Sequence, residues 1–254
     1  MNNFLIRSLE HTGVLSEVEI EALQHVNLRE RIVPARTDID HDDFSDTIHL
    51  ILDGFACRYK IWAEGERRIL SLLVPGDLCG GHATMPFVFH NKVAALTNCT
   101  IADIPRQTMA ELIDRYPRIA RALWWVTLAK LSTTQAWLAN MGRPADKRMA
   151  HFFCEVLVRL QAADLADENS YDLGLTQFDL AEIFGLSNVH VNRVLKALKE
   201  SGLLAVSNRR VTIFDVRRLK KLAEFDPGYL HDISGSTMEG RSTLVQEPIA
   251  RWRA

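Results

Sequence analysis

The sequence predicts an α+β fold in which an N-terminal antiparallel β-roll is followed by a long helix and a C-terminal winged helix-turn-helix. Three observations predict it. Short runs of β-branched and aromatic residues alternate with turn signals between residues 47 and 104, a long stretch with helical periodicity follows Pro117, and a helix-turn-helix pattern begins at Gln177. The length of 254 residues is enough for two domains of ordinary size.

The composition excludes several classes of protein. Hydrophobic residues make up 47% of the chain and charged residues 24%, which excludes disordered, collagen-like and disulfide-stapled chains. Four cysteines lie far apart with no Cys-x-x-Cys pair, so we expect reduced thiols, no metal and no cofactor; they are Cys57, Cys79, Cys99 and Cys154. A leader-like start and an apolar run of about 18 residues are both absent, which predicts a cytoplasmic protein without a membrane partner.

The N-terminal part is predicted to form a short helix and then strands. Residues 16–28 have helical character, and turn signals such as Asp53-Gly54 and Glu64-Gly65 separate the runs that follow. The expected strands are Ile48–Leu52, Phe55–Ile61, Ile69–Val74, Val93–Leu96 and Thr100–Ile104. Such short strands at near-regular spacing predict a small antiparallel barrel or sandwich.

A long helix is predicted from Pro117 to Met141, after a short helix at residues 107–114. Proline suits the first helical position, Gly142 is the expected C-cap, and Pro144 prevents continuation. Two stripes run along this helix: Ile119, Leu123, Val126, Lys130, Thr133 and Trp137 form one, and Trp124, Leu128, Leu131, Gln135 and Leu138 form the other. We expect one stripe to pack on the β-roll and the other to pair with the same helix of a second subunit. The alternative is a helix buried wholly within one chain.

The strongest motif lies between Gln177 and Lys196, after a predicted helix at 146–165 and a polar connection at 166–171. A helix-turn-helix needs a small residue where its helices touch and a glycine to turn the chain; Ala181 and Gly185 supply them. The apolar positions are filled by Leu180, Phe184, Leu186, Val191 and Val194. We expect Thr176 and Ser187 to cap the two helices and Gly202 to end the second.

The segment after this motif predicts a basic wing. Two short strands, Leu203–Val206 and Val211–Phe214, flank a polar tip, and Asp215 is placed to cap a further basic helix. Nine basic and two acidic residues lie between residues 186 and 223, although the whole chain carries a net charge of −2. This asymmetry predicts an anionic partner, nucleic acid first. The alternative is a solvated basic surface.

The predicted contacts with double-stranded DNA fall into two groups. Arg193 is the first candidate for a base contact, and Asn188, His190 and Asn192 come next. The candidates for positioning the sugar-phosphate backbone are Thr176, Gln177, Ser187, Lys196, Arg209 and Arg210. No catalytic residues are predicted.

These features together resemble the Crp/Fnr family of bacterial transcription regulators over residues 15–230. The order of a β-roll like the cyclic-nucleotide-binding domain, a long dimerisation helix and a winged helix is the family's, and Gly185–Leu195 is very similar to its recognition segment. The resemblance implies a homodimer that binds palindromic DNA, with RNA polymerase as a further possible partner. It divides the chain into a β-roll sensor at 1–115, a dimerisation helix at 116–142, a DNA-binding domain at 143–230 and a flexible tail at 231–254.

Departures from the family concern the effector and the target. Members that bind cyclic AMP use a glutamate and an Arg-Ser or Arg-Thr pair, whereas here Gly81 and Asn91-Lys92 stand at those positions. The implied effector region is Gly80, Gly81, His82, Asn91 and Lys92. Because two charge-assisted contacts are missing, we expect a regulator that cyclic AMP does not gate. Val189 replaces the glutamate by which members that recognise a TGA-type half-site contact cytosine.

Alternatives remain open at this point. The same regulator is alternatively gated by haem through His82, by oxidation of Cys57, Cys79 or Cys99, or by an unidentified small molecule. A [4Fe–4S] cluster like that of oxygen-sensing members is not expected, because no cysteine precedes Cys57. A metal-dependent enzyme built on the β-roll is a second class, although His41, His49, His82 and His90 lack recognisable ligand spacing. A protein-interaction module is a third class.

Overall fold

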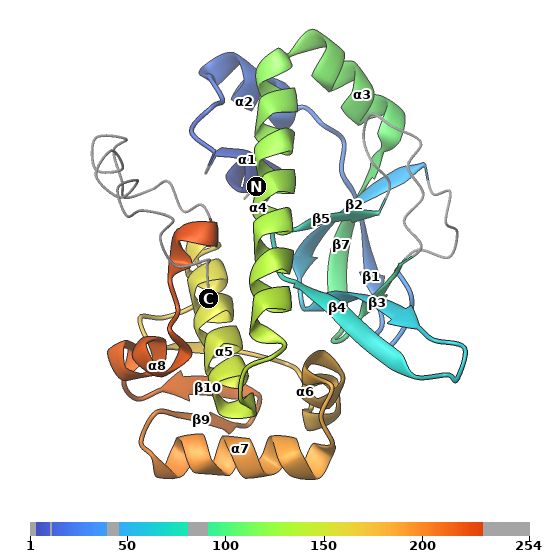
Figure 1. Ribbon diagram of the computed structural model, residues 1–254. Coiled ribbons are helices and arrows are strands. Elements are labelled where there is room, and N and C mark those ends of the chain that lie inside the picture. The colour runs from blue at the N-terminus through green and yellow to red at the C-terminus, as the bar shows by residue number, and fades with distance from the viewer. Residues whose placement is uncertain (1–3, 11, 40–45, 81–90, 231–254) are drawn as a thin grey trace, which may run out of the picture.

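The computed structural model describes residues 4–10, 12–39, 46–80 and 91–230 (Figure 1). A long central helix has the β-roll on one side and a smaller C-terminal domain at its far end (Figure 1). The N-terminal elements are α1 (Phe4–Glu10), α2 (Glu17–Gln24), β1 (Arg29–Val33), β2 (Thr47–Asp53), β3 (Ala56–Ile61), β4 (Arg67–Leu73), β5 (Leu78–Gly80), β6 (Lys92–Ala95), β7 (Cys99–Pro105) and α3 (Arg106–Arg115). The others are α4 (Pro117–Asn140), α5 (Ala145–Ala162), β8 (Ser170–Asp172), α6 (Gln177–Phe184), α7 (Asn188–Glu200), β9 (Leu204–Ser207), β10 (Arg210–Ile213), α8 (Val216–Ala223) and the 3-10 helix η1 (Pro227–Leu230).

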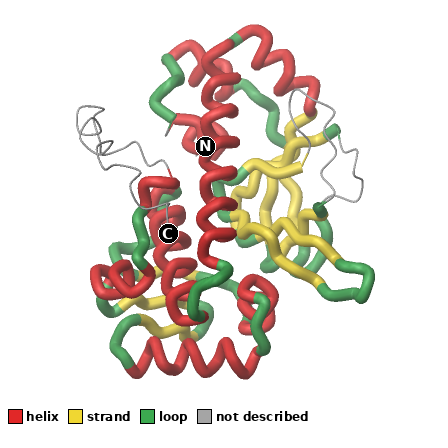
Figure 2. Tube along the Cα trace, in the orientation of Figure 1, coloured by secondary structure: helices red, strands yellow, loops and turns green. Residues whose placement is uncertain are grey.

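Two antiparallel sheets form the β-roll, as the sequence predicts. One has the strand order β1-β7-β2-β5 and the other β4-β3-β6. Their strands are the yellow segments to the right of the long helix in Figure 2. Their inward-facing apolar side chains meet in one core, because successive side chains of a strand point to opposite faces. Its members are Val33, Ile39, Ile51, Ala56, Leu73, Cys79, Val93, Ala95, Cys99 and Ile101.

The expected helix at residues 16–28 is wrong in its last four residues. It begins at a capping box of Ser16 and Glu19 but ends at Gln24, and strand β1 starts at Arg29. The sequence Arg-Glu-Arg-Ile-Val of β1 is charged, and Ile32 is 76% exposed at the edge of the sheet. This strand therefore lacks the alternation that marks a strand in sequence. Helix α1 and the three-residue strands β5 and β8 were also not predicted, and β8 lies in the expected polar connection.

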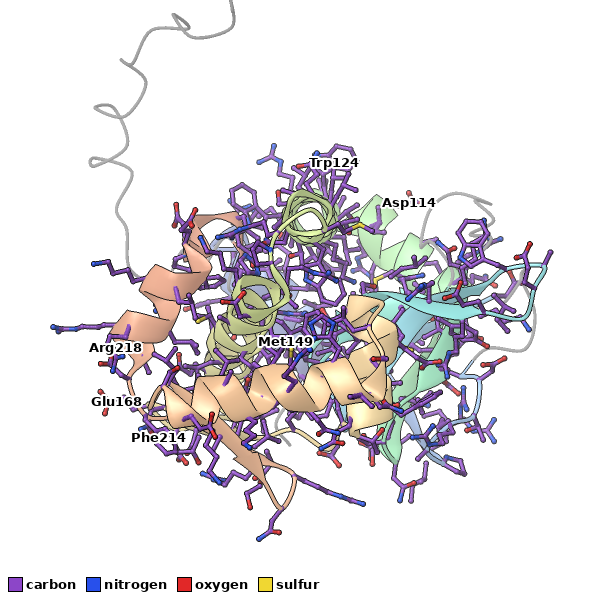
Figure 3. All side chains as sticks on the ribbon, turned by 60° about the horizontal axis from the view of Figure 1, so that its bottom comes forward. Asp114, Trp124, Met149, Glu168, Phe214 and Arg218 are labelled. Carbon is purple, nitrogen blue, oxygen red and sulfur yellow. The ribbon has the colours of Figure 1, made fainter. Side chains whose placement is uncertain are left out.

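Helix α4 carries both predicted stripes on different faces. Ile119 is fully buried against α1, α2 and β2, whereas Trp124 and Leu138 of the other stripe are 65% and 67% exposed. Trp124 projects away from the rest of the chain (Figure 3). The alternative of a helix buried within one chain is therefore wrong. The expected C-cap at Gly142 is also wrong, because the helix ends one residue earlier and Met141 is the C-cap.

A single core joins the β4-β3-β6 sheet to the C-terminal domain. Tyr59, Ile69 and Leu72 from the sheet belong to the same buried cluster as Phe152 of α5 and Phe184 of α6. The predicted helix at 146–165 is α5, and ten of its residues are buried. The C-terminal domain is completed by the small sheet β8-β10-β9 and by α8, which packs on α5.

A buried polar network connects the same parts. The fully buried Glu155 accepts hydrogen bonds from the indole Nε1 of Trp137 at 2.9 Å and from the hydroxyl of Tyr229 at 2.8 Å. Burial raises the pKa of Glu155. Arg159, one turn further along α5, contacts both Glu155 and Asp77 of the turn before β5, the latter at 2.5 Å. The network therefore links α4, α5, η1 and the β-roll.

His151 makes the stability of this fold depend on pH. Burial, with a smaller contribution from Arg143, lowers its pKa from 6.5 to about 4. Because the unfolded chain binds this proton more readily, stability is full above pH 6.5 and is lost as the pH falls toward 4, by about 2 kcal/mol at pH 5. Urea unfolding of the wild type and of His151→Phe at pH 7.5 and pH 5 checks this. Equal losses in both proteins would exclude His151 as the cause.

Candidate nucleic-acid interface

Helices α6 and α7 form the predicted helix-turn-helix. The hydroxyl of Thr176 accepts a hydrogen bond from the amide of Asp179, whose carboxylate accepts from the amide of Thr176, so α6 begins at a capping box. Gly185 ends α6 in the left-handed conformation at φ 63°. Ser187 caps α7 by accepting from the amide of His190 at 3.2 Å. Each cap lies at the residue that the sequence predicts.

Helix α7 lies at the lower edge of the molecule (Figure 1). Val191, Val194 and Leu198 are buried against the core and fix the rotation of the helix about its own axis. The opposite face is exposed and carries Asn188, Val189, Asn192, Arg193, Lys196 and Lys199. This arrangement resembles the recognition helix of a helix-turn-helix, which enters the major groove. His190 is only half-exposed.

Val189 and Lys199 are the residues of this face that sequence reasoning left out of the contact set. Val189 is 79% exposed, the largest exposed fraction among the large hydrophobic residues of the described chain. An isopropyl group exposed in the first turn of such a helix suits contact with a thymine methyl group. The signal was available in the sequence, because Val189 is the one large apolar residue among the exposed positions of the second helix.

The wing is a two-residue hairpin between β9 and β10. Ser207 pairs with Arg210, and Asn208 and Arg209 at the tip have φ angles of 50° and 64°. Two positive φ angles are typical of a type I′ turn, whose twist matches that of the flanking strands. The tip therefore holds the Arg209 side chain out from the sheet, and Arg209 is exposed.

Arg210 has carboxylate partners within the domain. Its guanidinium contacts Asp172 at 3.1 Å and also Asp167, and it donates to the hydroxyl of Ser170 at 2.8 Å. Arg210 is thus ion-paired with β8 and with the loop before it. Thr176 and Gln177 are exposed at the start of α6, and the Thr176 hydroxyl is within 3.3 Å of Arg36 from the β-roll.

Only part of the predicted effector region is described, because Gly81 and His82 lie outside the described residues. Gly80 adopts a φ of 87°, and a Cβ atom there would lie 2.8 Å from the ring of His49, so glycine permits close packing of β5 on β2. Lys92 is exposed and lies 3.8 Å from Asp38. Asn91 is half-exposed. The described residues of this set are not brought together into one pocket by any contact that we observe.

Helix α4 contacts strand β5, which precedes this region in the chain. The amino group of Lys130 donates a hydrogen bond to the carbonyl oxygen of Leu78 in β5, and burial lowers the pKa of Lys130. A side-chain hydrogen bond therefore joins the long helix α4 to strand β5, which precedes the predicted effector region. Lys130 belongs to the stripe that the sequence predicts to face the β-roll.

The thiols and histidines of the described residues favour neither redox nor metal chemistry. The four cysteines are buried, and burial raises the pKa of Cys57 to about 12 and that of Cys99 to about 11, which favours the less reactive thiol form. Within the described ranges no three His, Cys, Asp or Glu side chains are grouped to hold a metal ion. The ring nitrogen Nδ1 of His49 is hydrogen-bonded to Oδ1 of Asp103 at 2.7 Å, while His41 and His90 lie outside the described residues.

Among the described residues no helix is long and apolar enough to span a bilayer.

Comparison with known proteins identifies the family. A family model described as the Crp-like helix-turn-helix domain matches residues 147–222, and one described as the cyclic nucleotide-binding domain matches residues 36–116. The chain belongs to the Crp/Fnr family of transcription regulators. It is thus a sequence-specific DNA-binding regulator, as the resemblance implies, and the family consists of regulators rather than enzymes.

Individual relatives extend over most of the chain. The transcriptional activator protein FnrL of Cereibacter sphaeroides is 26% identical over 215 residues, covering 82% of this chain and 85% of that protein. The nitrogen fixation regulation protein FixK of Bradyrhizobium diazoefficiens is 24% identical over 220 residues, covering 86% and 91%. The structure of FixK2 from Bradyrhizobium japonicum matches with a TM-score of 0.67 at 21% identity; the match covers 78% of this chain and 98% of that one, which shows the same fold.

Replacing Arg193 with alanine tests the predicted base contact. The reference DNA is a site recovered with the wild-type protein by selection from a random library. We expect Arg193→Ala to weaken binding to this selected site by about 1–3 kcal/mol and to remove most of the preference for it over scrambled DNA. The reason is that a bidentate arginine distinguishes guanine from other bases. Competition binding measured by fluorescence anisotropy gives both affinities. A variant that prefers its site as strongly as the wild type would show that Arg193 makes no base contact.

Replacing Arg209 tests the wing in the opposite way. Glycine tolerates the positive φ of this position, so Arg209→Gly removes the charge without straining the turn. We expect weaker binding to all sequences alike and a salt dependence whose slope falls by about one, since a phosphate contact carries no sequence information. Affinities for selected and scrambled DNA at several salt concentrations measure this. Loss confined to the selected site would instead assign Arg209 a base contact.

Proposed function

We propose that this regulator acts as a homodimer that reads a palindrome through α7 without gating by cyclic AMP. The observation that carries the proposal is the exposed face of α7, which two caps and three buried side chains hold in one orientation. Arg193 makes the leading base contact, and Val189 and Asn192 lie beside it. Lys196 and Arg209 contact phosphates, with further positioning by Thr176, Gln177 and Ser187.

The exposed stripe of α4 supports the homodimer. Trp124, Leu128, Leu131 and Leu138 are all exposed large hydrophobic residues spaced along one face of a helix. Such a face at coiled-coil spacing is stabilised when a second copy of the helix covers it. The pairing places two copies of α7 in successive major grooves, about 34 Å apart.

The effector region supports independence from cyclic AMP. Neither the glutamate nor the arginine that hold the nucleotide in cyclic-AMP-binding relatives is present, and the exposed Lys92 lies next to Asp38. The hydrogen bond of Lys130 connects α4 to β5 without a bound nucleotide. The burial of the cysteines and their raised pKa values disfavour the alternative of gating by thiol oxidation.

The remaining parts of the proposal follow from the family. Residues 1–115 act as the sensor domain, 116–142 as the dimerisation helix and 143–230 as the DNA-binding domain, in the cytoplasm where the DNA lies. The relatives named as activators make RNA polymerase a candidate partner. We infer no catalytic role, because the family consists of transcription regulators.

Selection of binding sites from a random DNA library tests the proposal directly. Purified protein without added ligand, at about 0.15 M salt, is expected to enrich a palindrome. Sequence-blind binding that decreases steeply with salt would contradict activity without an effector. Recovery of an asymmetric site would contradict reading by a symmetric dimer.

Charge on the exposed stripe tests the dimer. We expect Trp124→Glu with Leu131→Glu to weaken self-association by about 100-fold or more, because carboxylates at the centre of an apolar helix pair must be desolvated. Sedimentation velocity measures the oligomeric state, and Leu165→Glu, at an exposed leucine outside α4, is the matched control. A double variant with the same mass distribution as the wild type would exclude this face as the interface.

A further inference from the structure

Three arginines of the β-roll surround the first helix of the helix-turn-helix. We call Arg36, Arg67 and Arg68 the arginine cradle. Arg36 lies at the start of α6, where it is 3.3 Å from the hydroxyl of Thr176 and 3.6 Å from the carboxylate of Asp179. This ion pair joins the sensor domain to α6, the helix on which α7 packs.

Arg67 pairs with the middle of α6, whereas Arg68 pairs with Glu66 of the β-roll and lies beside the end of α6. Arg67 is 3.7 Å from the carboxylate of Glu182, and both side chains are largely buried, at 23% and 11% exposure. Arg67 is oriented by the ring of Tyr59, whose centroid is 4.2 Å away. At the end of α6, a Cβ atom on Gly185 would lie 2.7 Å from the guanidinium of Arg68, so the turn glycine leaves room for that arginine.

The charges across this boundary depend on each other. Asp179 Oδ1, Glu182 Oε2 and Arg67 Nε are buried and have no hydrogen-bond partner among the described residues. Burial raises the pKa of Glu182, and Arg67 opposes that shift. If α6 moved along the sheet, these groups would move away from the opposite charges that they now face, which is costly for buried ions.

Apolar packing alone does not fix the position of α6. The hydrophobic effect is non-directional, so the contact of α6 with β4 tolerates small sliding movements. The ion pairs do not, because their energy depends on the distance between specific atoms. The cradle therefore selects one position of α6 on the sensor.

The position of α6 determines where α7 lies relative to α4. The two helices of the motif pack on each other, and the short segment 141–144 connects α4 to the DNA-binding domain. In the proposed dimer, α4 carries the two-fold axis. Each base pair added between half-sites rotates them by about 35° about the DNA axis, so a fixed α7 fits one spacing.

We propose that the arginine cradle sets the half-site spacing that the dimer accepts. It acts by positioning: none of its members needs to touch a base. The proposal rests on the DNA-binding homodimer described under the proposed function. Residues of the sensor domain would thus help to select DNA sites by the distance between the two half-sites, whatever the sequence of each half-site.

Charge reversal across one pair provides the test. Glu182→Arg and Arg67→Glu each place like charges together, and the double variant restores opposite charges. Glu168→Arg is the matched control, since it makes the same change of charge at an exposed residue of the same domain, on the side away from the β-roll (Figure 3). Each protein is titrated with duplexes in which two selected half-sites are separated by the preferred spacing or by one or more base pairs fewer or extra.

The measured quantity is the ratio of affinities for preferred and altered spacing, in which general changes of charge cancel. We expect the wild type and the Glu168→Arg control to lose about 10-fold or more per misplaced base pair, and each single variant about threefold or less. The double variant is expected to regain the wild-type ratio. Binding to a single half-site should be alike in all variants with the same total charge.

The outcomes separate this inference from the proposed function. Wild-type protein that binds no paired half-sites overturns the proposed function and the inference with it. A wild-type spacing preference that both folded single variants retain overturns the inference alone, as does a folded double variant with a broad profile. Thermal melting reports folding, and Glu182→Gln, which removes the charge but keeps the shape, replaces charge reversal if the single variants do not fold.

Discussion

The packing of the β4-β3-β6 sheet against α5 and α6 holds the DNA-binding domain against the β-roll. Aromatic and aliphatic side chains from both sides, such as Tyr59 and Leu72 on the sheet and Phe152 and Phe184 opposite, lie in one continuous core. Domains that share a core in this way do not move independently, because displacement exposes apolar surface to water. The shared core therefore keeps the DNA-binding domain against the β-roll, although its covalent connection to α4 is only residues 141–144.

Buried polar groups add direction to this packing. Arg159 of α5 contacts the carboxylate of Asp77 and the carbonyl oxygen of Leu72, while Asp77 also accepts from the amide of Val74. The turn that leads into β5 is therefore held by the DNA-binding domain itself. Any displacement of that turn moves an acceptor of a buried arginine, and such a loss is expensive in a region of low polarity. The turn before β5 and the DNA-binding domain are physically adjacent through this contact.

The sequence was sufficient for the parts of this architecture that depend on local patterns. The caps at Thr176 and Ser187, the turn at Gly185 and the start of α4 at Pro117 each follow from one residue's conformational preference, and the structure confirms them. Elements without a local pattern were missed. Strand β1 is charged and at an edge, and β5 and β8 have three residues each, so tertiary pairing rather than sequence periodicity defines them.

The candidate site was predictable to a similar extent. The exposed positions of α7 follow from helical periodicity once the buried valines are recognised, and Arg193 and Asn192 lie among them. The ion pairs of Arg210 with Asp167 and Asp172 were not predictable, because their partners are about 40 residues away in the chain. The arginine cradle is further still from any local signal: Arg36 and Thr176 are 140 residues apart.

Affinity for DNA and orientation of the DNA-binding domain thus depend on different sets of charges. Arg36 and Arg67 face Asp179 and Glu182, so their charge is neutralised within the molecule and adds little to the attraction of a polyanion. Most basic residues of α7, the wing tip and α8 are instead exposed on the DNA-binding domain. In the proposed complex, phosphate contacts of α7 and the wing can therefore strengthen or weaken without changing the position of α6. Conversely, a change at the boundary with the β-roll can alter the geometry of the proposed dimer while every proposed DNA-contacting side chain remains the same.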